Sequence, residues 1–458
     1  MTQPAESIGK GESQSPAFEL TGKPSSLKLL LRYPVLLLAF GPPVLENKYR
    51  PVNPTMTRFD YWSVFQVALV VVVAARAAYR LTFAHSIVIP RPARTIVGLA
   101  FFLSALFAIS AMYSPKAFIT VAFAILYCLN LICILEFLVD VFRNPPNWMR
   151  VVIELRFICL LLLGLLILVF LFKPQLAIIT TSYGIRLLGG SFCQVHIVCP
   201  VIAIVSAYSF LHSLESKLLS ASFFLASTAA LVASQWRGAI FSLLFVLIFL
   251  FIDWARMKKH FQIKMTAFAG IAVLLIGFTW GILGSHRVWV AFSHNQGRES
   301  LLNGSDRVDQ WVALIRFSIG HPLGLGYIAN IDRYAKGYPW GRYGVQGIDN
   351  GYLEVLGVAG WLALAVYATI IIKTGALGWR LARNRSLPSA PHNGVTSDSA
   401  RCAFYLFLYC ILEQMENSEF SIPLKQSFYI QYILIAIILG QSATLLSASR
   451  SVDAPMTN

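Results

Sequence analysis

Long apolar runs recur along this chain, and they constrain its fold more than any other feature. Runs of roughly 20 residues, enough for a helix to cross the hydrocarbon core of a bilayer, recur through most of the sequence. Hydrophobic residues make up 57% of the chain and charged residues only 13%, whereas soluble domains have about 45–50% and about 25%. Because backbone polar groups must be hydrogen-bonded within lipid, these runs predict an all-α integral membrane protein.

About twelve transmembrane helices are predicted, with one large polar loop late in the chain. The first apolar segment, 27–45, is interrupted by Arg32 and Pro34. Further apolar spans lie near residues 60–80, 95–113, 117–139, 152–172, 187–209, 217–235, 238–254, 264–284, 350–374, 402–418 and 426–447. The predicted organisation is a disordered cytoplasmic tail (1–26), helices one to nine (27–284), a periplasmic catalytic loop (285–348), helices ten to twelve (349–447) and a second cytoplasmic tail (448–458).

Basic residues in the short loops predict the orientation of the chain, because such loops tend to stay in the cytoplasm. With a cytoplasmic N-terminus, the inner connections carry Arg80, Arg91, Arg94, Arg143, Arg150, Arg256, Arg380, Arg383 and Arg385. This count places the 285–348 loop outside the cell, which is the periplasmic face if the cell is Gram-negative. The formal charge of +16 comes from scattered residues rather than a dense basic cluster, so no nucleic-acid partner is expected.

The polar loop is predicted to contain one amphipathic helix that begins after Ser305 and Asp306. Its apolar residues recur at helical spacing, at Val308, Trp311, Val312 and Ile315. Such a helix lies either on the membrane or on the helix bundle. The sequence HPLGLG, from His321 to Gly326, then predicts the end of the helix at the proline and a tight turn at Gly324 and Gly326.

Three arginines are predicted on the outer side of the membrane: Arg186, Arg237 and Arg307. Each has a structural explanation, with Arg237 as an interfacial anchor, Arg186 as a snorkelling residue at a helix end, and Arg307 as the ion-pair partner of Asp306 or Asp309. The functional alternative is a set of fixed cations that binds a lipid-linked anion. A guanidinium suits a diphosphate because its planar fork donates two parallel hydrogen bonds and keeps its charge.

Asp349 and Asn350 precede a predicted transmembrane helix, so capping of that helix is one explanation for them. The alternative is that Asp349 is a general base, which accepts a proton from a sugar hydroxyl as that hydroxyl attacks an anomeric carbon. Glu354 lies about one turn deeper, where it either pairs with an arginine or is itself the base. The sequence has neither a nucleotide-binding glycine loop nor metal-ligand spacing of His and Cys, so no cofactor and no metal are expected.

These segments together resemble the O-antigen ligase and polymerase superfamily of bacterial surface-polysaccharide assembly. The matching segments are RLLGG at Arg186, SQWRG at Arg237, DRVDQW at Arg307, HPLGLG from His321, and DNGYLEVLGVAGW from Asp349. The family usually has His-Asn or His-Ser where this chain has Asp349-Asn350, and its histidine is thought to activate the acceptor hydroxyl. The resemblance therefore leaves the identity of the base open between a transferred role for Asp349 and another carboxylate.

The resemblance implies a fold akin to that of the lipid-linked, all-helical glycosyltransferases of the GT-C type. It further implies metal-independent inverting transfer from an undecaprenyl-diphosphate-linked glycan, whose diphosphate contacts Arg237 and Arg307. The candidate substrate-binding residues are Arg186, His321, Gly324, Gly326, Asn350 and Glu354. Membrane lipid, a flippase and a chain-length regulator are the expected partners.

Polymerisation of a surface polysaccharide is the leading functional hypothesis. A ligase that transfers glycan to lipid A-core is the alternative within the same chemistry. A polytopic transporter or flippase is the alternative of another class, although the two halves of the chain show no similarity of the kind that transporters often have. A non-enzymatic membrane subunit of an export complex is the third, and in it the arginines would be anchors only.

Overall fold

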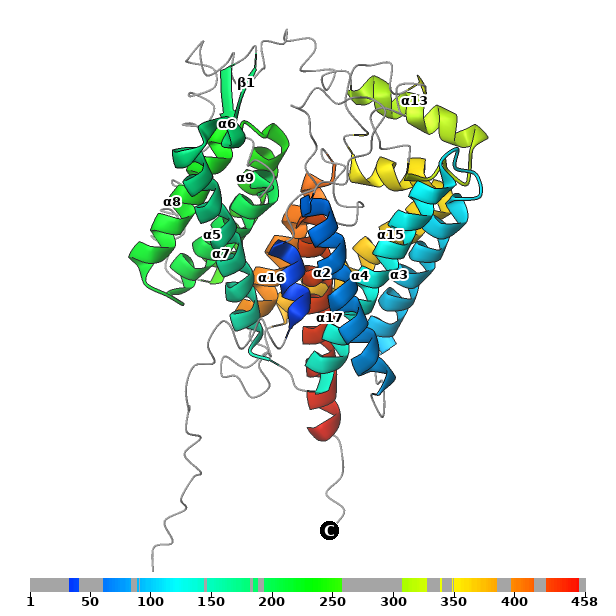
Figure 1. Ribbon diagram of the computed structural model, residues 1–458. Coiled ribbons are helices and arrows are strands. Elements are labelled where there is room, and N and C mark those ends of the chain that lie inside the picture. Colours follow the sequence, from blue (N-terminus) through cyan, green and yellow to red (C-terminus); the bar gives the residue numbers. More distant parts are fainter. Residues whose placement is uncertain are drawn as a thin grey trace, which may run out of the picture.

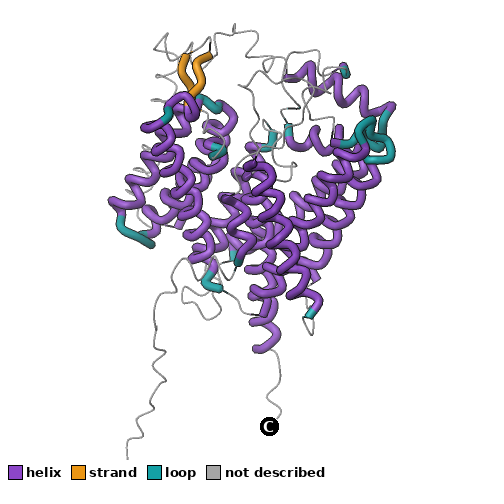
Figure 2. Tube along the Cα trace, in the orientation of Figure 1, coloured by secondary structure: helices purple, strands orange, loops and turns teal. Residues whose placement is uncertain are grey.

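The computed structural model describes residues 33–40, 61–83, 89, 91–143, 146–181, 184–187, 193–257, 307–327, 338–339, 348, 350–384, 397–415 and 426–452. Within these residues the regular structure is helical apart from one short hairpin (Figures 1 and 2). Among them, seven helices are long and apolar enough to cross a membrane. The prediction of a multi-pass α-helical membrane protein is thereby confirmed, whereas the predicted tail at 1–26 and span at 264–284 lie outside the described residues.

Two groups of helices stand side by side in the bundle (Figure 1). The first group contains α2 (Tyr61–Thr82), α3 (Arg91–Ser110), α4 (Ala117–Arg143) and the later α15 (Gly351–Arg383). The second contains α5 (Trp148–Phe172), α7 (Val195–His212), α8 (Lys217–Ser234) and α9 (Arg237–Met257). Helix α7 packs against the other three members of its group, which explains why nearly all of its residues are buried.

Helices α16 (Ser397–Glu413) and α17 (Gln426–Val452) join the two groups. Helix α16 contacts α5, α7 and α9 on one side and α15 on the other, while α17 packs on α16, α4 and α15. The last helix α17 continues to Val452, beyond its predicted end at residue 447. The C-terminal helices therefore form the centre of the bundle rather than its edge.

The region before α7 differs from the prediction. After α5, a four-residue helix α6 (Pro174–Ala177) leads into strand β1 (Ile178–Thr181), which pairs antiparallel with β2 (Gly184–Leu187). The expectation that Arg186 lies at a helix end is wrong, because this residue lies in β2, opposite Ile179. The β-branched run at 178–181 and the glycine at 184 favour strand and turn over helix, so α7 begins only at Val195.

The first predicted span is described over residues 33–40 only. Here the chain forms a short 3-10 helix, η1 (Pro34–Phe40), whose residues Val35, Leu36 and Leu38 are buried. Seven residues of 3-10 helix rise about 14 Å. This is less than half of the roughly 30 Å hydrocarbon core, so η1 alone does not span a membrane.

Ion pairs gather at the end of the bundle opposite α13. Arg80 pairs with Glu136 and Asp140, Arg150 with Glu154, Arg156 with Glu215, His212 with Asp398, and Arg401 with Asp253. The arginine-rich connections predicted to be cytoplasmic lie at this end, since α2, α4, α9 and α15 all end there. The other end of the bundle carries the candidate site.

Candidate functional site

Helix α15 is broken at Gly360, where φ is 80° and ψ is −172°. The part before the break runs across the end of the bundle, and the part after it turns down into the bundle (Figure 1). A Cβ atom at residue 360 would lie 1.8 Å from the carbonyl oxygen of Pro322. Both the positive φ and this close approach require glycine at the break.

The HPLGLG turn forms backbone hydrogen bonds with α15 at the break. Its backbone and the backbone of α15 pair as Leu325 N–H to the Gly357 carbonyl (2.9 Å), Gly326 N–H to the Val358 carbonyl (2.8 Å), and Trp361 N–H to the Pro322 carbonyl (3.1 Å). These bonds replace those that the helix loses at its break. An interrupted helix in a membrane protein is tolerated when its free backbone groups find such partners.

Gly324 and Gly326 give the turn its shape, and the predicted tight turn is present. Both residues have φ of +76°. A Cβ atom at Gly324 would lie 2.5 Å from the Val358 carbonyl, and one at Gly326 would lie 2.4 Å from the Thr120 hydroxyl. The two glycines let the turn pack against α15 and α4. This packing accounts for their presence, and a substrate-binding role for them stays a prediction.

The predicted amphipathic helix is present as α13 (Arg307–Gly320), but it faces the bundle with other residues. Its buried residues are Gln310, Leu314 and Ser318. Val308 and Val312 of the predicted apolar stripe are 45% and 39% exposed. Leu314 instead packs with Leu325 and Ile348 in a small hydrophobic cluster of its own. Tertiary contact with the turn therefore decides which face of α13 is buried.

Arg307 and His321 lie at opposite ends of this helix, so the structure does not bring them together. The fourteen residues of α13, at a rise of 1.5 Å each, separate the backbones of these two residues by about 21 Å. Arg307 is half-buried. The His321 ring is exposed and stacks on Phe317 with 3.9 Å between ring centroids, and its Nδ1 lies 3.2 Å from the Phe317 carbonyl oxygen.

Asn350 caps the first part of α15, as one of the two explanations for it predicts. Its side-chain oxygen accepts hydrogen bonds from the backbone N–H groups of Tyr352 and Leu353, each at 3.0 Å. Its amide nitrogen donates to the Met415 carbonyl at 3.0 Å. Both polar atoms of this side chain therefore take part in structural bonds. Asp349, the candidate base, lies outside the described residues, between buried Ile348 and nearly buried Asn350.

Glu354 is 0% exposed and lies one turn inside α15. It is close enough to Tyr327 for its charge to act on that phenol. Burial raises the pKa of the Tyr327 hydroxyl well above its ordinary value, and the charge of Glu354 adds to this shift. Tyr327 is therefore a neutral, buried phenol whose ring packs on Phe107 and Phe123, and Glu354 is an interior residue of this region.

The turn that carries Arg237 joins α8 to α9. Gln235 adopts a left-handed conformation (φ 55°), Trp236 follows, and half-buried Arg237 begins α9. The Trp236 ring lies 4.5 Å from the ring of His196 at the start of α7. The hydroxyl of Tyr409 in α16 donates to the His196 carbonyl.

This series of contacts links the Arg237 turn to the cap of α15 through the end of α16. Beyond Tyr409, α16 ends beside the first turn of α15, where the Gln414 carbonyl accepts from Gly351 N–H at 2.8 Å. The Met415 carbonyl accepts from Asn350 in the same place. The SQWRG and DNGY segments, more than a hundred residues apart in sequence, therefore lie at one end of the bundle.

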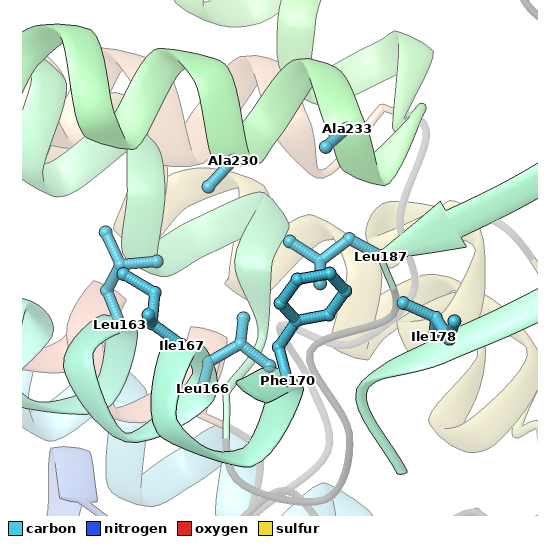
Figure 3. Close-up of a pocket in the computed structure, with 8 residues that line it drawn as sticks. All are labelled: Leu163, Leu166, Ile167, Phe170, Ile178, Leu187, Ala230 and Ala233. Carbon is cyan, nitrogen blue, oxygen red and sulfur yellow. The ribbon is translucent and has the colours of Figure 1, made fainter. Parts of the chain in front are cut away.

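A cavity of about 310 Å³ lies below the β1–β2 hairpin (Figure 3). All of its lining residues are apolar: Leu163, Leu166, Ile167, Phe170, Ile178, Leu187, Ala230 and Ala233. Leu187 adjoins Arg186 in strand β2, and Ala233 lies at the end of α8, four residues before Arg237 in the chain. Phe170 and Ile167 are about half-exposed, so the cavity reaches the apolar outer surface of the bundle.

The sequence reasoning missed the break in α15 and the residues that hold it. The signal for the break is the pair Gly357 and Gly360 inside an apolar helix, which follows the HPLGLG turn in the chain. No comparable signal exists for Gln414 or Tyr367, whose bonds join distant elements. Among the described residues, no three His, Cys, Asp or Glu side chains are grouped in a way that could hold a metal ion.

Comparison with known proteins identifies a family match for part of the chain. A search among curated proteins finds no significant match. Residues 221–368 match the family model described as O-antigen ligase. The matched region contains the turn with Arg237, helix α13, the HPLGLG turn and the cap of α15. Residues 221–368 thus carry the O-antigen ligase signature, which confirms the resemblance to the O-antigen ligase and polymerase superfamily predicted from the motifs.

Proposed function

We propose that this protein is a metal-independent inverting glycosyltransferase of the inner membrane. Its donor is an undecaprenyl-diphosphate-linked oligosaccharide, and it joins the repeat units of a surface polysaccharide at the periplasmic face. The observation that carries the proposal is the family match, because residues 221–368 include Arg237, Arg307 and Asp349. The contacts that bring the Arg237 turn and the α15 cap to one end of the bundle support it.

The proposed reaction is a single displacement. An acceptor sugar hydroxyl attacks the anomeric carbon of the donor glycan, and Asp349 accepts the hydroxyl proton. The new glycosidic C–O bond forms while the anomeric C–O bond to the diphosphate breaks, and undecaprenyl diphosphate leaves. Arg237 and Arg307 stabilise the negative charge that develops on the leaving group, which fixed donors do well at a poorly hydrated interface. Glu354 is the alternative base, and its complete burial disfavours direct contact with substrate.

The apolar cavity below the hairpin is the proposed site for the isoprenoid units nearest the diphosphate. It has an all-apolar lining and opens between helices. Its lining includes Leu187, the neighbour of Arg186 in β2, and Ala233 at the end of α8, four residues before Arg237. Because the surrounding lipid is as apolar as the cavity, van der Waals packing rather than removal of hydrocarbon from water holds the tail there. In this proposal the tail of the donor lies in the cavity and its diphosphate lies near Arg186 and Arg237.

The further parts of the proposal concern organisation and partners. The protein has about twelve transmembrane helices in a GT-C-like arrangement. The 285–348 loop is the periplasmic catalytic loop, His321 contacts the acceptor sugar, and a flippase and a chain-length regulator are partners. A ligase acting on lipid A-core is the second candidate within this chemistry. A transporter is the alternative of another class, and the family match disfavours it.

Replacement of Arg237 or Arg307 by lysine tests the proposal. Lysine keeps the charge but loses the bidentate fork, so we expect product formation to fall at least about ten-fold at unchanged protein level. Arg316→Lys is the matched control, because Arg316 is an exposed residue of the same helix as Arg307. Full activity of both Arg237→Lys and Arg307→Lys would contradict diphosphate recognition by these side chains.

A further inference from the structure

Gln414, directly after α16, bonds to both parts of the broken helix α15. Its backbone carbonyl accepts from Gly351 N–H at 2.8 Å, in the first turn before the break. Its side-chain oxygen accepts from the Tyr367 hydroxyl at 2.5 Å, two turns after the break at Gly360. Gln414 is 0% exposed. A single buried residue therefore connects the two segments on either side of the break.

Helix α17 strengthens this connection. The side-chain amide of Gln431 donates to the Tyr367 hydroxyl at 3.0 Å, and Gln431 is also fully buried. Three side chains from α15, α17 and the end of α16 thus form one hydrogen-bonded group inside the bundle. Buried networks of this kind fix the relative positions of the elements that they join, since breaking one bond leaves a polar group without water.

The backbone at the break does not depend on Gln414. The HPLGLG turn already supplies partners for the carbonyls of Gly357 and Val358. The hydrogen-bonded side chains of Gln414, Tyr367 and Gln431 instead determine where the first part of α15 lies relative to its second part and to α16. The first part begins at the Asn350 cap, and Asp349 directly precedes that cap.

We propose that Gln414 and Tyr367 are positioning residues, which fix the first part of α15 relative to its second part and to α16. This inference rests on the proposed function, in which Asp349 takes the proton from the acceptor hydroxyl. A displacement of about 1 Å in such a group lowers turnover by about 100-fold. Neither residue contacts substrate in this account, so both act through the placement of the cap.

The test uses Gln414→Met and Tyr367→Phe in the full-length protein. Methionine and phenylalanine keep the side-chain volumes, and in Gln414→Met the Tyr367 hydroxyl keeps its bond to Gln431. We expect turnover at saturating substrate to fall at least ten-fold in each variant, with the donor KM unchanged within two-fold. The double variant is expected to lose no more than Tyr367→Phe alone, because Tyr367→Phe already removes the bond to Gln414 together with the bond to Gln431.

Gln441→Met is the matched control. Gln441 is a fully buried glutamine of α17, and its side-chain amide makes no hydrogen bond to the described residues. Its replacement is expected to leave turnover unchanged, which separates positioning from a general loss of stability. Full turnover in both Gln414→Met and Tyr367→Phe, or additive losses in the double variant, would overturn the inference.

Hydrogen exchange separates the failure of this inference from the failure of the proposed function. The backbone amides of residues 351–353 are expected to exchange faster in Gln414→Met than in Gln441→Met, whether or not the protein forms polymer. Absence of product from the unmodified protein would refute the proposed function, while the exchange comparison would still test the connection. Equal exchange rates in the two variants would overturn it.

Discussion

At the scale of single residues, the backbone at Gly360 decides the shape of the candidate site. Gly360→Ala introduces a Cβ atom 1.8 Å from the Pro322 carbonyl oxygen at a φ of +80°. We expect a loss of stability of about 3 kcal/mol or more, from backbone strain and overpacking together. The measurement is the thermal unfolding midpoint of the purified protein in detergent.

Gly164→Ala is the matched control for that substitution. Gly164 lies inside α5, and an added Cβ atom there would meet nothing within 4 Å. Alanine in a helix interior is favoured over glycine by about 0.5–1 kcal/mol, so we expect an unchanged or raised midpoint. Equal effects of the two substitutions would show that the break in α15 does not need glycine.

The sequence predicted some of these single residues and missed others for a physical reason. Asn350 as a cap and Gly324 with Gly326 as turn residues were predictable, because the preference of Asn for helix caps and of Gly for turns depends only on neighbouring residues in the sequence. Gln414 and Tyr367 carry no local signal, because their hydrogen bond joins positions 47 apart in sequence. Which buried polar side chains meet depends on how helices pack.

At the scale of elements, the cap of α15 offers a direct comparison with the cap of α5. Asn350 accepts from two backbone N–H groups, and Asn147 caps α5 by accepting from Arg150 N–H at 3.2 Å. Replacement of either by alanine is expected to cost about 1 kcal/mol of stability. Only Asn350→Ala is expected to lower turnover, because only that cap adjoins Asp349.

Unfolding midpoints and initial rates of both variants check this prediction. The losses of stability should be similar and the rates different. An unchanged rate in Asn350→Ala, together with the expected loss of stability, would contradict a catalytic role for this end of α15.

The cavity below the hairpin gives a second prediction at this scale. Ala230→Phe places a ring in the cavity, whereas Ala68→Phe places one on an exposed face of α2 as a control. We expect Ala230→Phe to raise the KM for a long-chain donor by about ten-fold, because the tail loses its buried contacts. A donor with a short tail should be affected much less. Equal KM values for Ala230→Phe and Ala68→Phe would exclude the cavity as the tail site.

Hydropathy predicted the long helices well, since length and apolar composition suffice to identify a membrane-spanning helix. It did not predict the β1–β2 hairpin, which lies almost entirely in the connection between the spans predicted at 152–172 and 187–209. For α13 the sequence left open whether its apolar stripe faces the membrane or the bundle, and the face that packs on the HPLGLG turn is that of Leu314, with Leu325 and Ile348. This choice depends on tertiary contacts, which the spacing of apolar residues does not report.

At the scale of the whole molecule, one end of the bundle carries the candidate site and the other carries the ion pairs. The account requires the first end to face the periplasm. All seven native cysteines are buried except Cys128, which is half-buried, so labelling of introduced cysteines has a low background. Ile319→Cys in α13 and Leu214→Cys in the α7–α8 turn report on the two ends, since these residues are 71% and 38% exposed.

A membrane-impermeant maleimide should label Ile319→Cys in cells whose inner membrane is intact. Leu214→Cys should react only after that membrane is permeabilised. The reverse pattern would place the candidate site in the cytoplasm and would contradict the proposed use of a periplasmic donor.

The overall layout was predictable from the sequence to the extent that it follows from the order of apolar runs and from the positions of arginines. The gathering of the Arg237 turn, α16 and the α15 cap was expected only from the predicted topology. The contacts that produce it, such as those of Trp236 with His196 and of Asn350 with Met415, come from helix packing.

Synthesis by the purified protein tests the central claim most directly. The protein is incubated with its undecaprenyl-diphosphate-linked repeat unit in chelator-containing buffer, and the products are separated by size. The account predicts a ladder of lipid-linked chains that grows with time, and its loss in Arg237→Lys and Asp349→Asn. A repeat unit that stays unextended, while the Arg316→Lys and unmodified proteins are folded, would contradict the claim.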